Sequence, residues 1–585
     1  CTCTPGRAPR PGAAAPPRRI VHPPKERSSI PAGGFDYDVV VVGSGFGGTM
    51  AARPLVEAGL DVLVVERGPW VPRGEHNWEP DGTLEVTPYH SKDGLHRDGS
   101  SGPPSRVGTA ACVGGPSVFY GGVSFRFREG DFEPPAEITG DSGARWPLGY
   151  RDLRPHYRRA ERVLGVSGVA GDDPVGPERR APYPAEPGEL TPVSRRLAET
   201  ARGMGLRPFR LPLAINHGRD DARAECVACN TCDTFACAVG AKNDLAVAVL
   251  PELMRKGLEL RPNTAVTGLR SSGGRVRELE LRDRRTATRH TVTARGVVLA
   301  AGALRERSPA ADSVGRYLTR HCSAIAFGFF PEPAEGWDRF HKQIGLNDFY
   351  FGDDRSRGNG GKSGRRWPLG NGGRSAPGGR PPSKLGNIQQ VQTPANGVIR
   401  SALPDLAADA LEPAARRLVG LLALAEDSPR AENRVELHPS RKDEAGLPEL
   451  VIRHRYAERD LAAREALLDR ARKVLGRAGA LFCYTHEIET FSHALGTVRM
   501  GEDPSADPLT PGGRYRGIEN LWVTDGSALP TAGGVNPSLT IAANALRIGE
   551  GIAERLAAER EEGRVSPAPQ RAGGRQEGGR PEAGE

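Results

Sequence analysis

The sequence predicts an α/β fold built on a Rossmann-like dinucleotide-binding domain. Three features near the N-terminus predict it: an apolar strand at residues 39–42, a glycine-rich turn directly after it, and a second strand, DVLVVE, at residues 61–66. A stretch of helical character separates the two strands, as in a βαβ unit. A strand that is β-branched and apolar throughout is typical of a parallel sheet that is covered on both faces.

The glycine-rich turn has the spacing that binds a pyrophosphate. Gly43 would make the tight turn, Gly45 would let the backbone approach the phosphates, and Gly48 would let the helix pack closely on the strand. Glu66 ends the second strand, where an acidic side chain accepts the ribose hydroxyls. The motif predicts a dinucleotide but does not distinguish FAD from NAD. Pro54 lies inside the predicted helix and should kink it.

Charge and composition indicate which parts of the chain stay outside the core. The formal net charge is +8, but residues 1–33 carry +5 and residues 352–384 carry +6, so the remainder is slightly acidic. Basic residues do not alternate with aromatic residues on any predicted element, so a nucleic-acid partner is not expected. Both basic segments are rich in Gly, Pro and Arg, and the tail after about residue 558 is polar. All three are predicted to be disordered.

The chain carries no signal for a membrane or for secretion. No run of 18 apolar residues is present, so no transmembrane segment is expected. The basic N-terminal stretch is not followed by an apolar region of the kind found in signal peptides. A cytoplasmic location is therefore the expectation.

The C-terminal region resembles a known family. Three blocks carry the resemblance in order: FSHALGTVRMG from residue 491, GIENLWVTDGSALP from residue 517, and GGVNPSLTIAANALR from residue 533. Together they closely resemble the C-terminal signature of the glucose-methanol-choline (GMC) oxidoreductases, which are FAD enzymes. Residues 102–127, 146–168 and 296–304 resemble further conserved segments of that family, so the resemblance covers most of residues 35–555.

The resemblance implies a composite α+β architecture of two domains. A Rossmann-like FAD-binding domain would be assembled from residues 35–130, 220–310 and 490–557. A substrate domain with an antiparallel sheet would come from residues 131–219 and 311–489. An N-terminal arm (1–33), an insert (352–384) and a tail (558–585) would lie outside these domains. The helix that usually follows residues 296–304 is expected to be shortened or absent.

Two residues suit the oxidation of an alcohol. Hydride transfer to a flavin needs a base for the hydroxyl proton and a donor that holds the developing alkoxide. His493 suits the first role because the pKa of imidazole is near neutrality, and Asn536 suits the second as a neutral donor. The family places its active-site residues at these two positions. His321 and His486 lie outside every motif and are expected to be structural.

The resemblance also implies which residues contact FAD. Pro537 would begin a helix whose N-terminus faces the flavin and stabilises negative charge on the reduced ring. No histidine occurs in residues 108–127, where some members of the family attach the flavin covalently, so non-covalent FAD is expected. The remaining cofactor contacts implied are Phe46, Gly114, Gly115, Ser117, Tyr120, Gly121, Val266, Asp525 and Gly526.

Four cysteines lie within twelve residues. Cys226, Cys229, Cys232 and Cys237 follow the spacing C-x2-C-x2-C-x4-C, one residue longer than a ferredoxin run. Some GMC dehydrogenases carry a cysteine-rich segment here, and in certain FAD-dependent glucose dehydrogenases it binds an iron–sulfur cluster. An iron–sulfur cluster, a disulfide or redox pair, another metal and inert thiols all stay open as interpretations.

The leading hypothesis is an FAD-dependent oxidoreductase that acts on the CH–OH group of an alcohol, a sugar or polyol, or a sterol. His493 would take the hydroxyl proton while the hydride passes to N5 of the flavin. With a cluster, electrons would pass to a cytochrome, a quinone or a ferredoxin-like partner; without one, oxygen could be the acceptor. The alternatives are a non-redox FAD lyase of the same fold and an inactive flavin-binding protein.

Overall fold

The computed structural model describes most of the chain between residues 34 and 565. The described ranges are 34–91, 95–97, 105–218, 223–301, 310–336, 338–352, 382–393, 413–444, 446–491 and 493–565. The N-terminal arm predicted at 1–33 and residues 302–309, where a shortened helix was expected, lie outside them. So does most of the predicted insert.

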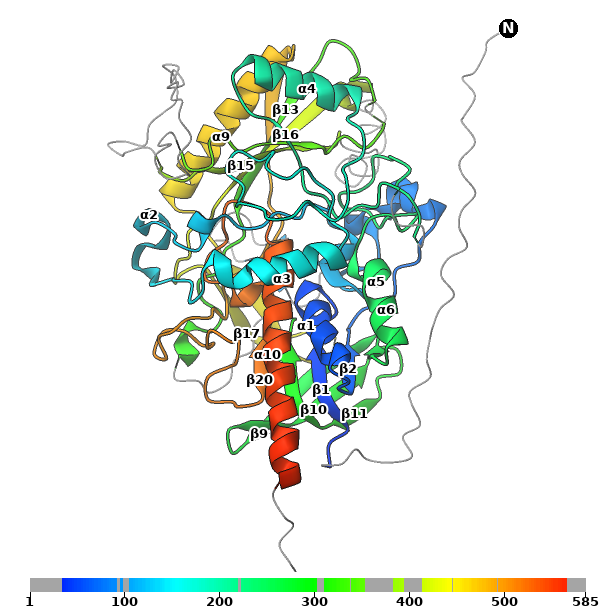
Figure 1. Cartoon of the computed structure of the whole chain (residues 1–585), viewed down its shortest axis with the longest axis vertical. Coiled ribbons are helices and arrows are strands. Elements are labelled where there is room, and N and C mark those ends of the chain that lie inside the picture. Colours follow the sequence, from blue (N-terminus) through cyan, green and yellow to red (C-terminus); the bar gives the residue numbers. More distant parts are fainter. Residues whose placement is uncertain are drawn as a thin grey trace, which may run out of the picture.

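A five-stranded parallel sheet forms the centre of the lower half of the molecule in Figure 1. Its order is β20-β12-β1-β2-β8, and its strands are β1 (Tyr37–Val42), β2 (Val62–Val65), β8 (Glu259–Arg261), β12 (Ala294–Leu299) and β20 (Leu521–Val523). The side chains of β1 and β2 are almost fully buried, as expected for strands covered on both faces. The five strands come from three segments that are far apart in the sequence.

Two long helices pack against each other beside this sheet. Helix α1 (Phe46–Glu57) continues through Pro54, and α10 (Ser538–Val565) runs along it (Figure 1). They approach closely at Gly549, where a Cβ atom would lie 2.4 Å from the carbonyl oxygen of Ala51 and 2.7 Å from Cγ of Pro54. Helix α3 (Tyr150–Val163) crosses the upper part of α10. A three-stranded antiparallel sheet of β9 (Thr264–Ser272), β10 (Arg275–Asp283) and β11 (Arg289–Val292) adjoins the parallel sheet.

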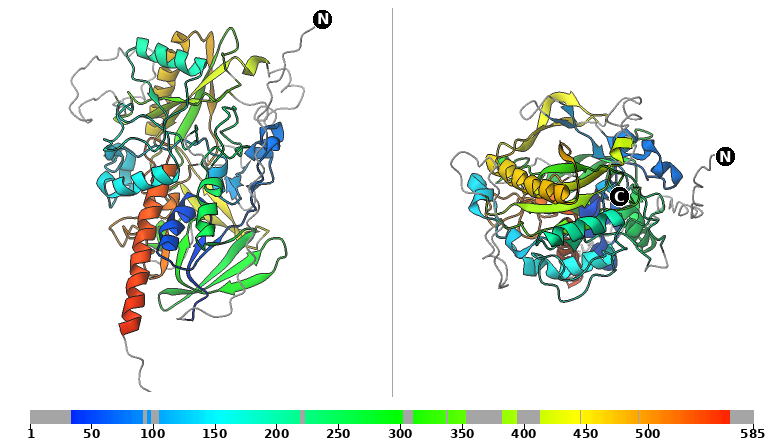
Figure 2. Two further views of the ribbon diagram at one scale, coloured as in Figure 1. Left: turned by 45° about the vertical axis from the view of Figure 1, so that its right-hand side comes forward. Right: turned by 90° about the horizontal axis from the view of Figure 1, so that it is seen from above.

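A six-stranded antiparallel sheet forms the upper half of the molecule (Figures 1 and 2). Helices α4 (Pro192–Gly203) and α9 (Glu458–Arg477) pack on one face, where they share a second apolar core with the sheet. The opposite face carries Asn387 and Gln389, which lie toward the C-terminal segment that contains Asn536. The strand order is β19 (Phe482–Glu487), β13 (Cys322–Phe329), β16 (Leu418–Ala425), β15 (Gly386–Val391), β14 (Ile344–Leu346) and β7 (Phe209–Arg210).

Shorter elements complete the described fold. A four-stranded sheet has the order β17-β18-β4-β5, and β3 pairs with β6. These and the remaining short elements are β3 (His90–Ser91), β4 (Leu95–Arg97), β5 (Ser105–Arg106), β6 (Thr109–Ala110), α2 (Ala136–Thr139), α5 (Leu245–Ala248), α6 (Leu250–Arg255), β17 (Arg434–Lys442) and β18 (Pro448–Arg453). The predicted α/β fold with a second, antiparallel sheet is confirmed. No described helix has the length and apolar character that crossing a bilayer would require.

Two of the predicted boundaries need correction. Residues 558–565 belong to α10 rather than to a disordered tail; the helix is held there by the ion pairs of Arg560 with Asp38, at 2.5 Å, and of Arg555 with Glu559, at 3.1 Å. Residues 382–384 of the predicted insert are part of the fold, and Lys384 is buried because it pairs with two buried carboxylates. Residues 353–381 and 566–585 lie outside the described residues.

Candidate active site

The three glycines of the first turn occupy positions with different steric demands. Gly43 has a φ of +96°, and a Cβ atom there would lie 2.6 Å from the carbonyl oxygen of Ala300. A Cβ atom on Gly48 would lie 1.9 Å from the carbonyl oxygen of Gly43. At Gly45 the nearest atom to such a Cβ is Cδ of Pro116, 4.0 Å away. The first and third glycines are therefore required by packing, whereas the second borders open space at the N-terminus of α1, where a pyrophosphate would fit.

Glu66 closes the turn from the end of β2. Its Oε2 accepts hydrogen bonds from the backbone N–H and the hydroxyl of Ser44, at 3.0 and 2.7 Å, and its Oε1 accepts one from the N–H of Gly68, at 3.0 Å. Burial raises the pKa of this carboxyl group, while the donors from Ser44 and Gly68 act in the opposite direction. Oε1 keeps acceptor capacity beyond its single bond. This is the capacity that a ribose hydroxyl would use.

The second glycine-rich segment lies against the first. A Cβ atom on Gly115 would lie 3.2 Å from Cα of Gly45, and the N–H of Gly114 donates to the hydroxyl of Ser44 at 2.9 Å. The hydroxyl of Ser117 donates to the carbonyl of Gly114 and accepts from the N–H of Leu245, so it stabilises the loop itself.

Two aromatic residues and an ion pair lie next to the two glycine-rich segments. The rings of Phe46 and Tyr120 lie edge to face, with their centroids 5.5 Å apart. Gly121 abuts the ion pair of Lys342 with Asp233, whose carboxylate would lie 1.9 Å from a Cβ atom at position 121. Val266 lies on β9 and packs against the main core.

The turn at Asp525 and Gly526 joins the cofactor side to the C-terminal segment. A Cβ atom on Gly47, in the first turn of α1, would lie 2.7 Å from Cα of Asp525. On Gly526 it would lie 2.5 Å from Cδ2 of Leu495, and the N–H of Gly496 donates to the carbonyl of Gly526 at 3.2 Å. Pro537 directly precedes the first turn of α10, whose N-terminal N–H groups lack intrahelical acceptors. The open space at Gly45 and these two helix N-termini fit FAD.

His493 lies opposite His321. The backbones of Thr319 and Leu495 exchange two hydrogen bonds, of 3.1 and 2.9 Å, in an antiparallel bridge. His321 lies two residues after Thr319, and His493 lies two residues before Leu495. The Nδ1 atoms of the two histidines are 3.2 Å apart. Nε2 of His321 lies 2.9 Å from the carbonyl oxygen of Gly533.

His321 is the residue that sequence reasoning missed. It was expected to be structural because no motif contains it, and the structure indeed buries it, but against the imidazole of His493. The contact depends on a pairing between segments 172 residues apart, for which the sequence shows no local pattern. His486, in contrast, is exposed on β19.

Burial favours the neutral form of both imidazoles. Burial lowers the pKa of His493 well below its usual range, and His321 and Lys342 act in the same direction. Burial lowers the pKa of His321 to about 4, against the opposing effect of the carbonyls of Gly533 and Ala532. A neutral imidazole can accept a proton, which is the first requirement for a base.

Asn536 is held by the second sheet. Its Oδ1 accepts a hydrogen bond of 3.0 Å from Nε2 of Gln389, which is fully buried on β15. With the amide oxygen held in this way, the NH₂ group of Asn536 is left as a donor. The Oε1 atom of Gln389 is buried and has no hydrogen-bond partner among the described residues.

Buried charges fix the loop between these two candidate residues. Glu426 accepts a hydrogen bond of 2.8 Å from the N–H of Gly533 and pairs with Lys384. Nζ of Lys384 also lies 2.6 Å from Oδ1 of Asp131. The hydroxyl of Tyr350 donates to Asp131 and accepts from the N–H of Gly534 at 2.8 Å. No local pattern in the sequence predicts this network, because its members come from separate elements.

The cysteine segment does not have the arrangement of a metal site. All four thiols are free, and the described part of the chain contains no group of three or more His, Cys, Asp or Glu side chains placed to bind a metal. The predicted iron–sulfur cluster is therefore not supported. Burial raises the pKa of Cys226 to about 12 and that of Cys232 well above its usual range, so both thiols stay protonated. Buried Lys242 ties the segment to Tyr120 by donating to the carbonyls of Tyr120, Cys232 and Phe235.

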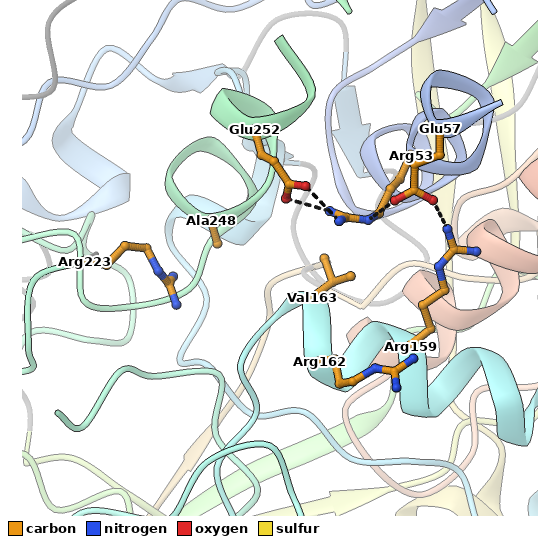
Figure 3. A pocket seen from close by; sticks show the side chains of 8 residues that line it. All are labelled: Arg53, Glu57, Arg159, Arg162, Val163, Arg223, Ala248 and Glu252. Atoms are coloured by element: carbon orange, nitrogen blue, oxygen red, sulfur yellow. Dashed lines mark hydrogen bonds and ion pairs between the residues drawn. The ribbon is translucent and has the colours of Figure 1, made fainter. Parts of the chain in front are cut away.

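An open hollow of about 470 Å³ lies on the surface between α1, α3 and α6 (Figure 3). None of the predicted site residues lines it. Arg53 pairs there with Glu57 and Glu252, and Arg159 pairs with Glu57. Two of the four arginines of its wall are thus paired with carboxylates, and the hollow lies apart from every predicted site residue.

Comparison with known proteins identifies relatives over nearly the whole chain. Family models described as GMC oxidoreductase match residues 37–311 and 429–545. A 6'''-hydroxyparomomycin C oxidase of Streptomyces lividus is 33% identical, over 92% of this chain and 95% of its own length. A paromamine 6'-oxidase of Streptomyces fradiae is 32% identical, over 88% and 91%. A 2-methyl-1,2-propanediol dehydrogenase of Mycolicibacterium austroafricanum is 27% identical, over 89% and 95%.

Solved structures support the fold. A pyridoxine 4-oxidase from Mesorbium loti superposes with a TM-score of 0.59 at 19% identity, covering 89% of this chain and 99% of its own. A formate oxidase of Aspergillus oryzae gives 0.61 at 14% identity, covering 90% and 99%. The sequence relatives are oxidases and dehydrogenases, so the lyase alternative gains no support. The chain belongs to the GMC oxidoreductase family and is an FAD-dependent oxidoreductase that acts on CH–OH groups.

Proposed function

We propose that this enzyme oxidises an alcohol group of an amino sugar or aminoglycoside to the aldehyde, with oxygen as the electron acceptor. Two relatives that are 33% and 32% identical over most of their length are named as oxidases of paromamine and of a hydroxyparomomycin. FAD, when bound, supplies the hydride acceptor. The cytoplasmic location stays a prediction.

His493 is the base in this proposal, and the observation that carries the assignment is its buried contact with His321, which occupies Nδ1 and leaves the other ring nitrogen. Its Nδ1 is engaged by His321, whereas its Nε2 makes no hydrogen bond with a described residue. That nitrogen is therefore free to take the hydroxyl proton as the hydride leaves the carbon. The protonated imidazole would then lose its proton to solvent.

Asn536 holds the oxygen from which the proton is taken. Its amide NH₂ donates to that oxygen, and the hydrogen bond strengthens as negative charge develops there. Gln389 keeps the amide in this orientation through its bond to Oδ1. The open glycine turn at Gly45, Glu66 and the N-termini of α1 and α10 would hold the cofactor.

Replacement of His493 by Ala tests the role of the base. We expect the variant to bind FAD in the wild-type amount but to have its flavin reduced by substrate about 100-fold more slowly or worse, as is typical for loss of a general base. Anaerobic stopped-flow spectroscopy with paromamine measures this rate. His486→Ala is the matched control, because His486 is exposed on β19. Wild-type reduction in the His493 variant would refute the assignment.

Steady-state turnover in air tests the acceptor. An oxidase should release one hydrogen peroxide for each aldehyde formed. A dehydrogenase would reduce its flavin anaerobically but form little peroxide, and would turn over with an artificial acceptor instead. This second outcome deserves the comparison because one relative, 27% identical, is named a dehydrogenase.

A further inference from the structure

We infer that His321 is a positioning residue that fixes the tautomer of His493, so that Nε2 of His493 is the basic nitrogen. The inference rests on the proposed role of His493 as the base. It assigns a function to a residue of the second domain that lies outside every motif of the sequence.

The backbone places the two imidazoles opposite each other. The bridge between Thr319 and Leu495 is antiparallel, and His321 and His493 each lie two residues from it along the chain. The rings meet edge to face, with their centroids 5.0 Å apart and an interplanar angle of 82°. Nδ1 of one ring lies 3.2 Å from Nδ1 of the other.

The hydrogen-bond partners then determine where each proton resides. A backbone carbonyl can only accept, so Nε2 of His321, 2.9 Å from the carbonyl oxygen of Gly533, must carry a hydrogen. A neutral imidazole has one N–H, so Nδ1 of His321 is an acceptor. Nδ1 of His493 must then be the donor in the contact between the rings, which leaves the lone pair of His493 on Nε2.

The carbonyl group of Gly533 and the backbone of His321 are both held by further contacts. Gly533 is fixed through its N–H by Glu426, and a Cβ atom at this position would lie 2.9 Å from Cζ of Phe127. His321 is fully buried, and its own carbonyl accepts a hydrogen bond of 2.9 Å from the hydroxyl of Tyr456. Its φ is +69°, a conformation that non-glycine residues rarely adopt and that clusters at functional sites.

Two substitutions separate positioning from mere space-filling. In His321→Asn, the amide oxygen lies near the former Nδ1 and can accept from His493, and asparagine tolerates a positive φ. In His321→Leu, the volume is kept but no acceptor remains. We expect the Leu variant to bind FAD and substrate normally but to reduce its flavin about 100-fold more slowly, and the Asn variant to stay within about 10-fold of wild type.

The pH profile adds a readout that a structural role would not move. His493 faces His321 and Lys342, and His321 also faces Lys384. The decrease in the rate of flavin reduction at acidic pH therefore reports on the protonation of the two histidines. We expect this decrease to shift along the pH axis in the Leu variant and to keep its wild-type position in the Asn variant. Equal rates and profiles in the two variants would overturn the inference.

A neutron crystal structure of the wild-type holoenzyme in D₂O decides the tautomers even if a variant fails to fold. Deuterium on Nδ1 of His493 and on Nε2 of His321 is the expected result. Deuterium on Nε2 of His493 would overturn the inference. If His493 is not the base, the His493→Ala variant would reduce its flavin at the normal rate. That result does not depend on the position of the deuterium, so it is distinguishable from a wrong tautomer.

Discussion

At the scale of single residues, the environment of His493 sets the pH range of the enzyme. Burial, His321 and Lys342 all lower the pKa of its imidazole well below the usual value near 6.5. The group is therefore already neutral at pH 6.5, and only more acidic solution protonates it. We expect the apparent second-order rate of flavin reduction to stay level from pH 8 down to about 6.5 and to fall below that. A half-maximal rate at or above pH 6.5, measured by anaerobic stopped flow, would contradict this environment.

Gln389 provides a second prediction for a single side chain. Gln389→Leu removes the donor that holds Oδ1 of Asn536, so the amide can rotate and present its oxygen to the alkoxide. We expect flavin reduction to slow by about 10- to 100-fold with little change in bound FAD.

The neighbouring Gln390 provides the control. Its Oε1 accepts from Ser194, on the opposite face of β15, so Gln390→Leu should affect thermal stability rather than the rate. The same loss of rate in both variants would show that the sheet, and not the bond to Asn536, is responsible.

At the scale of elements, Lys384 connects the start of β15 to the catalytic loop. Its ammonium is fully buried between Asp131 and Glu426, and Glu426 in turn holds Gly533. Lys384→Met leaves two carboxylates buried without a cation, so we expect the free energy of unfolding to fall by about 3–5 kcal/mol. Urea unfolding measures the change.

Lys256→Met is the control for Lys384. Lys256 is 46% exposed and pairs with Glu252 one helical turn away, so its loss should cost no more than about 0.5 kcal/mol. Similar losses in both variants would mean that the buried network contributes little.

The sequence predicted those elements whose pattern is local. The strands β1 and β2, the turn from Gly43 to Gly48 and the helix after Pro537 each follow from adjacent residues. The contact of His321 with His493 and the bond of Gln389 to Asn536 join segments more than 140 residues apart, so no local pattern announces them. The end of α10 was placed too early because its last turns are polar, yet polar residues such as Glu and Arg are good helix formers.

At the scale of the whole molecule, buried histidines that are neutral in the folded state make the free energy of unfolding depend on pH. Burial lowers the pKa of His217 and His321 to about 4, and lowers those of His341 and His493 as well. Each has a lower pKa folded than unfolded, so between the two values the unfolded chain binds more protons. The stabilisation by these groups is fully present above pH 6.5. Below pH 6.5 the free energy of unfolding decreases by about 1.4 kcal/mol per pH unit for each such group.

We therefore expect the melting temperature to drop steeply between pH 6.5 and pH 5. Scanning calorimetry of the holoenzyme measures it. His217→Gln should lessen the slope without changing the rate of flavin reduction, because the ring of His217 lies against Phe340. A melting temperature that stays constant over this range would contradict the burial of these imidazoles in neutral form.

The central claim is tested most directly by the visible spectrum of the FAD-loaded enzyme, mixed anaerobically with paromamine. We expect the absorption band of oxidised flavin to bleach within the time of turnover, to recover on admission of oxygen with release of hydrogen peroxide, and to leave an aldehyde as product. A band that persists with paromamine and with related amino-sugar alcohols, while FAD stays bound, would contradict the proposed substrate class.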